Sequence, residues 1–366
     1  MRYGRGHARR WARPTSPTPA GGEHAQLARY WTTDHDWRAF EARLNALPQY
    51  TTEIDGVRIH FVHVRSRHEN ALPLLMTHGW PGSIVELLGA AGPLTDPPSA
   101  ADAFHLVLPS LPGYGFSGEP AELGWENGRI ARAWATLMDR LGYQRYVAQG
   151  GDVGAAVTDA MARQAPAGLL GVHLSLLAPA LDLKDQLPAE TEQERAARDA
   201  VTAFATDGFA YFLEQSTRPQ TIGYALLDSP VALAAWMLDH DTDSYYKIAQ
   251  AFTDKQPVGG LTRDTILDNI TLYWLTGTGA SAARWYWEFG RATRAAAGPP
   301  PPISIPVAFT TFPGELWAAP RSWVEAVYPT LTYFHEAERG GHFAAWEEPD
   351  LFAAELREAF RPLREA

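Results

Sequence analysis

The chain has 366 residues, of which 46% are hydrophobic and 20% are charged, and its formal net charge is −11 at pH 7. This length suits one large α/β domain with an inserted subdomain. The negative charge argues against a nucleic-acid partner, and the absence of cysteine excludes disulfides and thiol chemistry. No apolar run approaches the roughly 20 residues of a membrane span, so we expect a cytoplasmic protein that binds no membrane.

The N-terminal part of the chain precedes the expected core. Residues 1 to about 25 are rich in arginine, proline and glycine, so we expect an irregular head. Apolar residues at helical spacing predict a helix over residues 36–47. An Asp-Gly pair at positions 55–56 separates two β-prone runs and predicts a hairpin. We therefore expect residues 1–50 to form an N-terminal extension.

Short apolar strands alternate with helices in the next segment, residues 51–178. The predicted strands cover residues 73–76, 106–108, 146–149 and 171–177. The helices between them carry apolar residues on one face, as in the helix that stops at Gly142. Strands that alternate with helices predict a parallel sheet that is covered on both faces.

The alternation stops near Pro179 and resumes after a run of prolines. Residues 179–302 have a helical pattern and many aromatic residues, so we expect an inserted helical cap. The cap ends in Gly298-Pro299-Pro300-Pro301-Pro302, which cannot be helical and makes a stiff linker. Residues 303–366 are expected to complete the core with two further strands and a final amphipathic helix.

The stretch Gly150-Gly151-Asp152-Val153-Gly154 lies between a predicted strand and a predicted helix. This is the context of a nucleophile elbow, G-x-Nuc-x-G, and no other G-x-S-x-G or G-x-D-x-G occurs in the chain. The nucleophile position holds Asp152, whose carboxylate can attack carbon and form an ester. The same pattern also occurs in ordinary turns, so the assignment needs catalytic partners elsewhere in the chain.

His342 and Glu315 are the candidate partners. An ester on a carboxylate must be hydrolysed, and His342, in the loop Gly340-Gly341-His342-Phe343 after the last strand, can activate the water. Glu315 follows the preceding strand and can fix the tautomer of the imidazole through a hydrogen bond. The chain order nucleophile, acid, histidine is that of α/β-hydrolases.

Two backbone amides are expected to bind the carboxylate oxygen that does not attack. One belongs to the residue after the nucleophile, Val153, and the other to Trp80 in the loop after an early strand. His78 precedes Trp80 in His78-Gly79-Trp80-Pro81, and we expect it to be structural, because it has no nucleophile of its own.

Four motifs together resemble those of the microsomal-type epoxide hydrolases. They are His78-Gly79-Trp80-Pro81-Gly82-Ser83, Pro109-Ser110-Leu111-Pro112-Gly113-Tyr114-Gly115-Phe116-Ser117, Gly150-Gly151-Asp152-Val153-Gly154 and Gly340-Gly341-His342-Phe343-Ala344-Ala345-Trp346-Glu347-Glu348-Pro349. The resemblance runs from about Tyr30 to the C-terminus. It implies an α/β-hydrolase fold, with a mostly parallel sheet flanked by helices, a helical cap and an N-terminal extension, and an enzyme that uses no cofactor and no metal.

The resemblance also directs attention to two tyrosines of the cap. Tyr211 precedes the run Ser216-Thr217-Arg218-Pro219, and Tyr286 lies in Arg284-Trp285-Tyr286-Trp287. They match the two tyrosines that serve the family as acids for the epoxide oxygen. An unperturbed phenol is protonated at pH 7 and can donate a hydrogen bond to that oxygen. Trp285 and Phe116 are expected to line the substrate pocket.

Two features depart from the family's pattern. Val153 stands where the family usually has an aromatic residue, which leaves the oxyanion amide in place but makes that pocket wall smaller. The N-terminal extension is shorter than usual, because the arginine- and proline-rich head replaces its earlier part. Membrane anchoring, which some relatives show, is therefore not expected.

These features predict an epoxide hydrolase that forms a glycol monoester on Asp152 and releases a vicinal diol, in detoxification or secondary metabolism. Its expected partner is a small-molecule epoxide, and a homodimer is left open. Three alternatives also fit the sequence. A haloalkane or haloacid dehalogenase with the same nucleophile would release halide, and a non-catalytic binding protein would hold epoxides without turnover. An enzyme that cyclises its substrate through an internal hydroxyl would add no water to the product.

Overall fold

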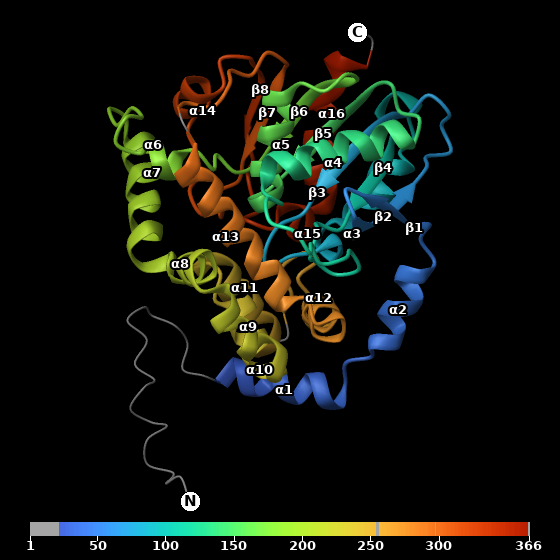
Figure 1. The fold of residues 1–366 in the computed structure, drawn as a ribbon, viewed down its shortest axis with the longest axis vertical. Coiled ribbons are helices and arrows are strands. Elements are labelled where there is room, and N and C mark those ends of the chain that lie inside the picture. The colour runs from blue at the N-terminus through green and yellow to red at the C-terminus, as the bar shows by residue number, and fades with distance from the viewer. Residues whose placement is uncertain (1–21, 254–255, 297, 365–366) are drawn as a thin grey trace, which may run out of the picture.

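A computed structural model describes residues 22–253, 256–296 and 298–364. In this part of the chain eight strands form one sheet in the order β1-β2-β4-β3-β5-β6-β7-β8 (Figure 1). β2 pairs antiparallel with β1 and β4, whereas the other neighbours pair parallel. The mostly parallel sheet with its flanking helices confirms the predicted α/β class.

The strands follow the predicted order and differ from the prediction at their ends. They are β1 (Gln49–Ile54), β2 (Val57–Val64), β3 (Leu72–Thr77), β4 (Phe104–Pro109), β5 (Tyr146–Gly150), β6 (Leu169–Leu174), β7 (Val307–Thr311) and β8 (Leu331–Glu336). The prediction of a strand over 171–177 was wrong at both ends. β6 stops at Leu174, and the apolar Leu176 and Leu177 are buried in the irregular segment after the strand rather than in the sheet.

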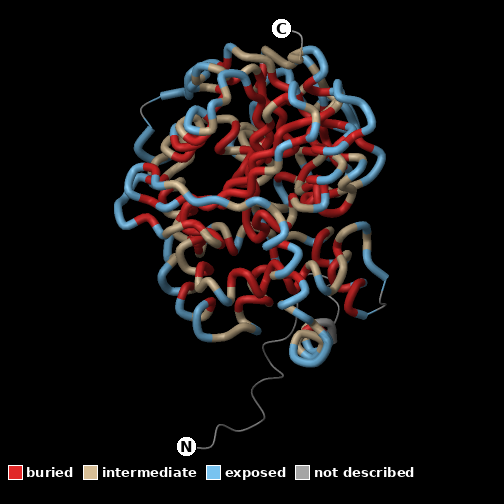
Figure 2. The backbone as a smooth tube through the Cα atoms, turned by 90° about the vertical axis from the view of Figure 1, so that its right-hand side faces the viewer, coloured by how far each residue is buried: buried red, intermediate tan, exposed pale blue. Residues whose placement is uncertain are grey.

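Two pairs of helices cover the two faces of the sheet (Figure 1). α4 (Asn127–Arg140) packs beside α5 (Asp152–Gln164) on one face, and α3 (Ile84–Thr95) packs beside α16 (Pro349–Phe360) on the other. Figure 2 shows buried residues concentrated in the sheet between these layers. The loops after β3, β5, β7 and β8 leave the carboxyl ends of parallel strands, which is the edge where ligands bind in open α/β sheets.

Helices fill the segment between β6 and β7. They are α6 (Ala180–Leu183), α7 (Glu192–Ala203), α8 (Ala210–Thr217), α9 (Pro219–Asp228), α10 (Pro230–Leu238), α11 (Thr242–Thr253), α12 (Arg263–Thr276) and α13 (Gly279–Ala295). Figure 1 shows α8 to α13 grouped below the sheet. The division of the chain at residues 50, 178 and 302 stays a proposal. None of the described helices is long and apolar enough to cross a membrane.

Two N-terminal helices, α1 (Gly22–Thr33) and α2 (Trp37–Asn45), pack against this helical segment. Asp268 on α12 lies 2.9 Å from His35 Nε2 and accepts a hydrogen bond from Arg43 at 2.8 Å. The predicted helix over 36–47 is confirmed. α1 starts inside the head that we expected to be irregular, because tertiary contacts with α10 and α11 stabilise a helix whose sequence shows little periodicity. The arginine cluster of residues 1–21 lies outside the described residues.

Two short helices remain on the C-terminal side. α14 (Arg321–Val327) lies between β7 and β8, and α15 (Ala344–Glu347) comes after the loop that follows β8. α15 packs against α3, which itself follows the loop after β3. This contact brings the loops after β3 and β8, which are far apart in the sequence, to one place at the edge of the sheet.

Candidate active site

Asp152 is the first residue of α5 and follows β5 almost directly. Its φ is +49°, a left-handed conformation that residues other than glycine rarely adopt. α5 approaches β3 very closely at this turn, since a Cβ on Gly154 would lie 1.9 Å from the carbonyl oxygen of Thr77. Glycine is therefore required there. The tight turn presents the Asp152 carboxylate at the strand end, as in a nucleophile elbow.

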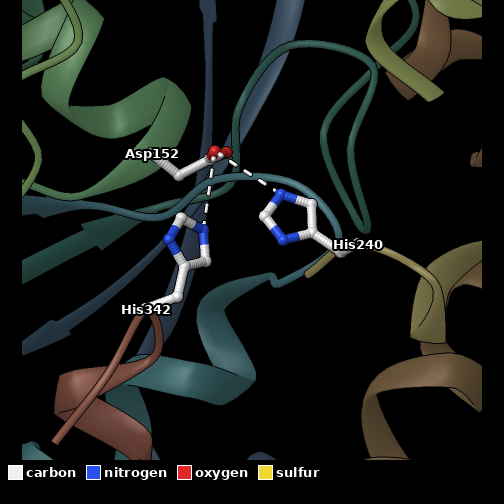
Figure 3. A group of neighbouring side chains, drawn as sticks. All are labelled: Asp152, His240 and His342. Carbon is white, nitrogen blue, oxygen red and sulfur yellow. Dashed lines mark ion pairs between the residues drawn. The ribbon is translucent and has the colours of Figure 1, made fainter. Parts of the chain in front are cut away.

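The two oxygens of the Asp152 carboxylate have different surroundings. The Trp80 N–H donates to Oδ1 at 2.8 Å, and the Val153 N–H also favours the charged carboxylate. Oδ2 lies 3.6 Å from His342 Nε2 and 3.9 Å from His240 Nε2 (Figure 3). Oδ1 thus accepts a hydrogen bond from the Trp80 amide, and Oδ2 faces two imidazole rings.

His342 and Glu315 reach Asp152 from the loops after β8 and β7. A bridge between Gly314 and Gly341 holds these two loops side by side. His342 Nδ1 lies 2.5 Å from Glu315 Oε1, and both side chains are only 1% exposed. Asp152, Glu315 and His342 therefore form one contiguous group, although they lie far apart in the sequence.

Burial and charge set the protonation of this group. Burial alone would lower the pKa of His342, but Glu315 and Asp152 outweigh it and raise that pKa well above its ordinary value. Burial alone would raise the pKa of Asp152, yet His342, His240 and the Val153 N–H hold it below its ordinary value. Asp152 is therefore a carboxylate near neutral pH, and His342 favours its imidazolium form.

The sequence of this chain is similar to those of known protein families and proteins. The family described as "Epoxide hydrolase N terminus" matches residues 10–87, and the family described as "alpha/beta hydrolase fold" matches residues 73–230. A Stigmatella aurantiaca protein that carries an epoxide hydrolase name is 52% identical over 92% of this chain and 75% of its own length. Epoxide hydrolase 1 of Sus scrofa is 36% identical over 91% of this chain and 78% of its own length. The chain belongs to the epoxide hydrolase family.

Solved structures agree with this assignment. Aspergillus niger epoxide hydrolase is similar at a TM-score of 0.78 and 33% identity, over 96% of this chain and 91% of that one. Juvenile hormone epoxide hydrolase from the silkworm Bombyx mori is similar at a TM-score of 0.80 and 27% identity, over 96% of this chain and 89% of that one. The resemblance found in the motifs and the predicted α/β-hydrolase fold are both confirmed.

The two predicted tyrosines of this epoxide hydrolase lie beside each other on α8 and α13. The ring centroids of Tyr211 and Tyr286 are 5.9 Å apart, and both rings are buried. The Tyr286 hydroxyl makes no well-formed hydrogen bond among the described residues, although it lies close enough to Tyr211 to oppose the rise in that phenol's pKa. Tyr211 Oη lies 3.0 Å from His240 Nε2. Burial, followed by the charge of Asp152, raises the pKa of both phenols well above its ordinary value, so both are protonated.

The two predicted pocket residues make contacts of another kind. Trp285 stacks on Phe289 with ring centroids 5.3 Å apart, and Phe116 packs edge-on against His60 of β2. Neither borders the small cavity next to His240, and their role in the pocket stays a prediction. That cavity, of about 20 Å³, is lined mainly by apolar side chains, among them Met237, Leu238, Ile248, Ile266, Ile270 and Phe343.

His78 has the structural role that the sequence suggested. Its Nε2 accepts the backbone N–H of Leu111 at 3.1 Å, which ties the loop after β3 to the loop after β4. Burial lowers the pKa of His78 to about 4, so the ring is neutral and can accept this bond near neutral pH.

Two ionisable side chains near Asp152 were not predicted from the sequence to belong to the site. His240 lies between α10 and α11, and Glu86 lies in the first turn of α3. Glu86 Oε2 is buried without a hydrogen-bond partner among the described residues. Burial, followed by the charge of Asp152, raises the pKa of Glu86 well above its ordinary value. The stretch Asp239-His240-Asp241 offered a signal, since it puts a histidine between two carboxylates, whereas Glu86 offered none.

Gly79 is the point at which a small change should disturb this epoxide hydrolase most directly. A Cβ there would lie 2.1 Å from Asp152 Oδ1. Gly79→Ala should push the carboxylate off the Trp80 amide and lower kcat about 100-fold, the usual cost of one lost oxyanion donor. Gly92→Ala on α3, where a Cβ meets nothing within 4 Å, is the control. Steady-state diol formation measures both variants, and full activity of Gly79→Ala would contradict the assigned geometry.

Proposed function

We propose that this enzyme converts an epoxide to a vicinal diol with Asp152 as its nucleophile. The observation that carries the proposal is the split environment of the carboxylate, with Oδ1 on the Trp80 amide at 2.8 Å and Oδ2 facing the site. Oδ2 attacks an epoxide carbon, a new C–O bond forms, and the ring C–O bond breaks. The product of this step is a glycol monoester, and the amides of Trp80 and Val153 stabilise Oδ1 throughout.

Tyr211 and Tyr286 act on the oxygen that leaves the epoxide ring. An opening epoxide develops alkoxide charge, and two buried, protonated phenols can donate hydrogen bonds to it. The unpartnered hydroxyl of Tyr286 supports this role, because a buried donor without a partner is costly unless a ligand satisfies it. A halide leaving group needs no proton, so the tyrosine pair favours epoxide opening over dehalogenation.

His342 acts in the second half of the reaction. The charge of Asp152 is one of the interactions that raise the pKa of His342. Ester formation removes this charge, so the pKa of His342 falls when a base is needed. The neutral ring, oriented by Glu315, takes a proton from water while the water oxygen adds to the ester carbonyl. Collapse of this adduct releases the diol and restores the Asp152 carboxylate.

Removal of either phenol tests the acid role. We expect Tyr211→Phe and Tyr286→Phe each to lower kcat/KM for an epoxide about 100-fold, since each loses a hydrogen-bond donor to the alkoxide. Tyr224→Phe is the matched control, because Tyr224 lies on α9 and is 68% exposed. It should keep wild-type kinetics. Two phenylalanine variants with full activity would remove the tyrosines from the mechanism.

A product assay tests the function as a whole. The protein is incubated with styrene oxide, an aryl epoxide, and in parallel with a chloroalkane, in the presence of EDTA. We expect a diol heavier than the substrate by one water, and no chloride release. Chloride release would favour the dehalogenase, and binding without turnover would favour a binding protein. An isomer of unchanged mass from a hydroxylated epoxide would favour cyclisation.

The aromatic rings of Phe212 and Trp285, which pack edge-on against Tyr286, support an apolar or aromatic epoxide as the small-molecule substrate. A homodimer stays open, and the cytoplasmic location and a reaction without metal or cofactor stay predictions. Because activity in the presence of EDTA does not need a removable metal ion, the product assay also tests the last of these.

A further inference from the structure

A second imidazole–carboxylate pair, His240 and Asp241, lies next to Asp152 and has no role in the proposed mechanism. His240 Nδ1 lies 3.1 Å from Asp241 Oδ2. Its Nε2 lies 3.0 Å from Tyr211 Oη and 3.9 Å from Asp152 Oδ2. The His240 side chain is 2% exposed. A buried ring that touches both the acid and the nucleophile needs a chemical explanation.

Asp241 determines which nitrogen of His240 faces the site. Asp241 is itself held by the backbone N–H of Ser244, which donates to Oδ1 at 2.8 Å. Burial would raise the pKa of Asp241, but His240, His342 and the Ser244 N–H lower it to about 2. A carboxylate on Nδ1 orients the ring and stabilises an imidazolium. With Nδ1 on Asp241, Nε2 faces Tyr211 Oη at 3.0 Å, so a proton on Nε2 would be donated to that oxygen and the phenolic hydrogen would stay free for the substrate.

We propose that His240, held by Asp241, supplies through Tyr211 the proton that the opening epoxide takes up. This inference rests on the proposed function. When Asp152 Oδ2 bonds to carbon, the electron pair of the broken ring C–O bond takes the proton of Tyr211. Tyr211 in turn takes the Nε2 proton of His240. The phenol is protonated before and after the step, and His240 ends neutral. His240 is thus a positioning and proton-supplying residue that acts through Tyr211.

The proton returns through His342. The ring centroids of His240 and His342 are 4.6 Å apart, and one ring nitrogen of each lies within 4.8 Å of the other, so one water can link them. After the ester has formed, the His342 imidazolium passes its proton to His240 and becomes the base. The attacking water gives one hydrogen to His342 and the other to the diol. One epoxide and one water therefore give one diol, with both rings restored.

Four ionisable groups face His240 from the elements around it. Tyr211 comes from α8, Asp152 from α5, His342 from the loop after β8, and Asp241 follows in the chain. The pKa of each aspartate is held below its ordinary value, and that of Tyr211 well above it. His342 is the second imidazole among these groups. His342→Gln removes this second imidazole from the measurement and also traps the ester.

Ester formation is therefore measured in the His342→Gln protein with styrene oxide, by rapid quench and mass spectrometry between about pH 5 and pH 9. If His240 supplies the proton, we expect the rate of ester formation to fall with rising pH along one titration. Adding Asp241→Asn should move the midpoint of this pH dependence down by about one pH unit, because His240 then loses its charged carboxylate partner. Adding His240→Gln should abolish the titration and slow ester formation about 30-fold at pH 6.

Two further variants test whether the pH dependence of ester formation belongs to His240. His335→Gln removes another imidazole–carboxylate pair, with Glu355 at 2.9 Å, on β8 outside the site, and should change nothing. Glu86→Gln should leave the midpoint in place, which separates His240 from the other buried group near Asp152. Circular dichroism checks the fold of each variant, and the Asp241→Asn midpoint keeps the test decisive should His240→Gln fail to fold.

Two outcomes would overturn the proton supply. One is an unchanged pH dependence in the His240→Gln protein, and the other is an equal loss of rate at every pH, which would make His240 a mere support of Tyr211. A His342→Gln protein that forms no ester at all would refute the proposed function instead, so the two failures are distinguishable.

Discussion

Asp152→Asn protein should make no ester, and its kcat should fall by at least about 10⁴-fold, as in enzymes that lose their nucleophile. The amide keeps the size of the side chain and can still accept the Trp80 N–H, so the turn should fold as before. What it loses is the charged Oδ2 that attacks carbon. Without that atom neither the first bond nor the ester that His342 hydrolyses can form.

The matched control for this variant lies on the same helix. Asp159 pairs with Arg163 at 2.6 Å on α5, outside the site, and Asp159→Asn should keep kcat within about twofold. Diol formation is measured for both proteins, with intact mass to detect any reversion of asparagine to aspartate. A freshly prepared Asp152→Asn protein with more than about one hundredth of wild-type activity would remove Asp152 from its assigned role.

His342→Gln should stop the reaction halfway. Attack on the epoxide needs Asp152 and the tyrosines, so the first step continues, but no base remains to activate water. We expect one substrate molecule per chain to stay on Asp152 and kcat to fall about 10³-fold or more. Intact mass should show the added substrate, and peptide mapping should place it on the peptide that contains Asp152.

Glu315→Gln extends this prediction. It removes the charge that orients His342 but leaves a hydrogen-bond acceptor in place of the carboxylate at 2.5 Å. Loss of a charged orienting partner should slow ester hydrolysis more than ester formation, so a partial build-up of ester is expected. Rapid hydrolysis without any build-up in both variants would exclude the histidine as the base.

Much of the catalytic group could be predicted from the sequence, because it depends on strand ends. Asp152, Glu315 and His342 each follow a predicted strand, and the carboxyl ends of parallel strands meet at one edge of a sheet. The turn at Asp152 also carries its own signal in Gly150 and Gly154, whose positions leave no room for a Cβ. Local sequence patterns are therefore enough to predict the catalytic residues that the sheet positions.

The residues that come from helix packing could not be predicted in the same way. His240 lies between α10 and α11 and reaches Asp152 through the way these helices pack, which no local pattern encodes. Glu86 looks like an ordinary charged residue in the first turn of a helix until α3 is packed next to Asp152. The roles of Tyr211 and Tyr286 came from family resemblance, since nothing local separates them from the other tyrosines.

Single turnover in water enriched in heavy oxygen tests the covalent mechanism most directly. With enzyme in excess over epoxide, the ester route sends an original Asp152 oxygen into the diol and leaves heavy oxygen in the Asp152 carboxylate. We therefore expect an unlabelled diol in the first turnover, together with a labelled peptide that contains Asp152. A diol that carries heavy oxygen from the first turnover, with an unlabelled Asp152 peptide, would show that water attacks the epoxide directly and would contradict the account.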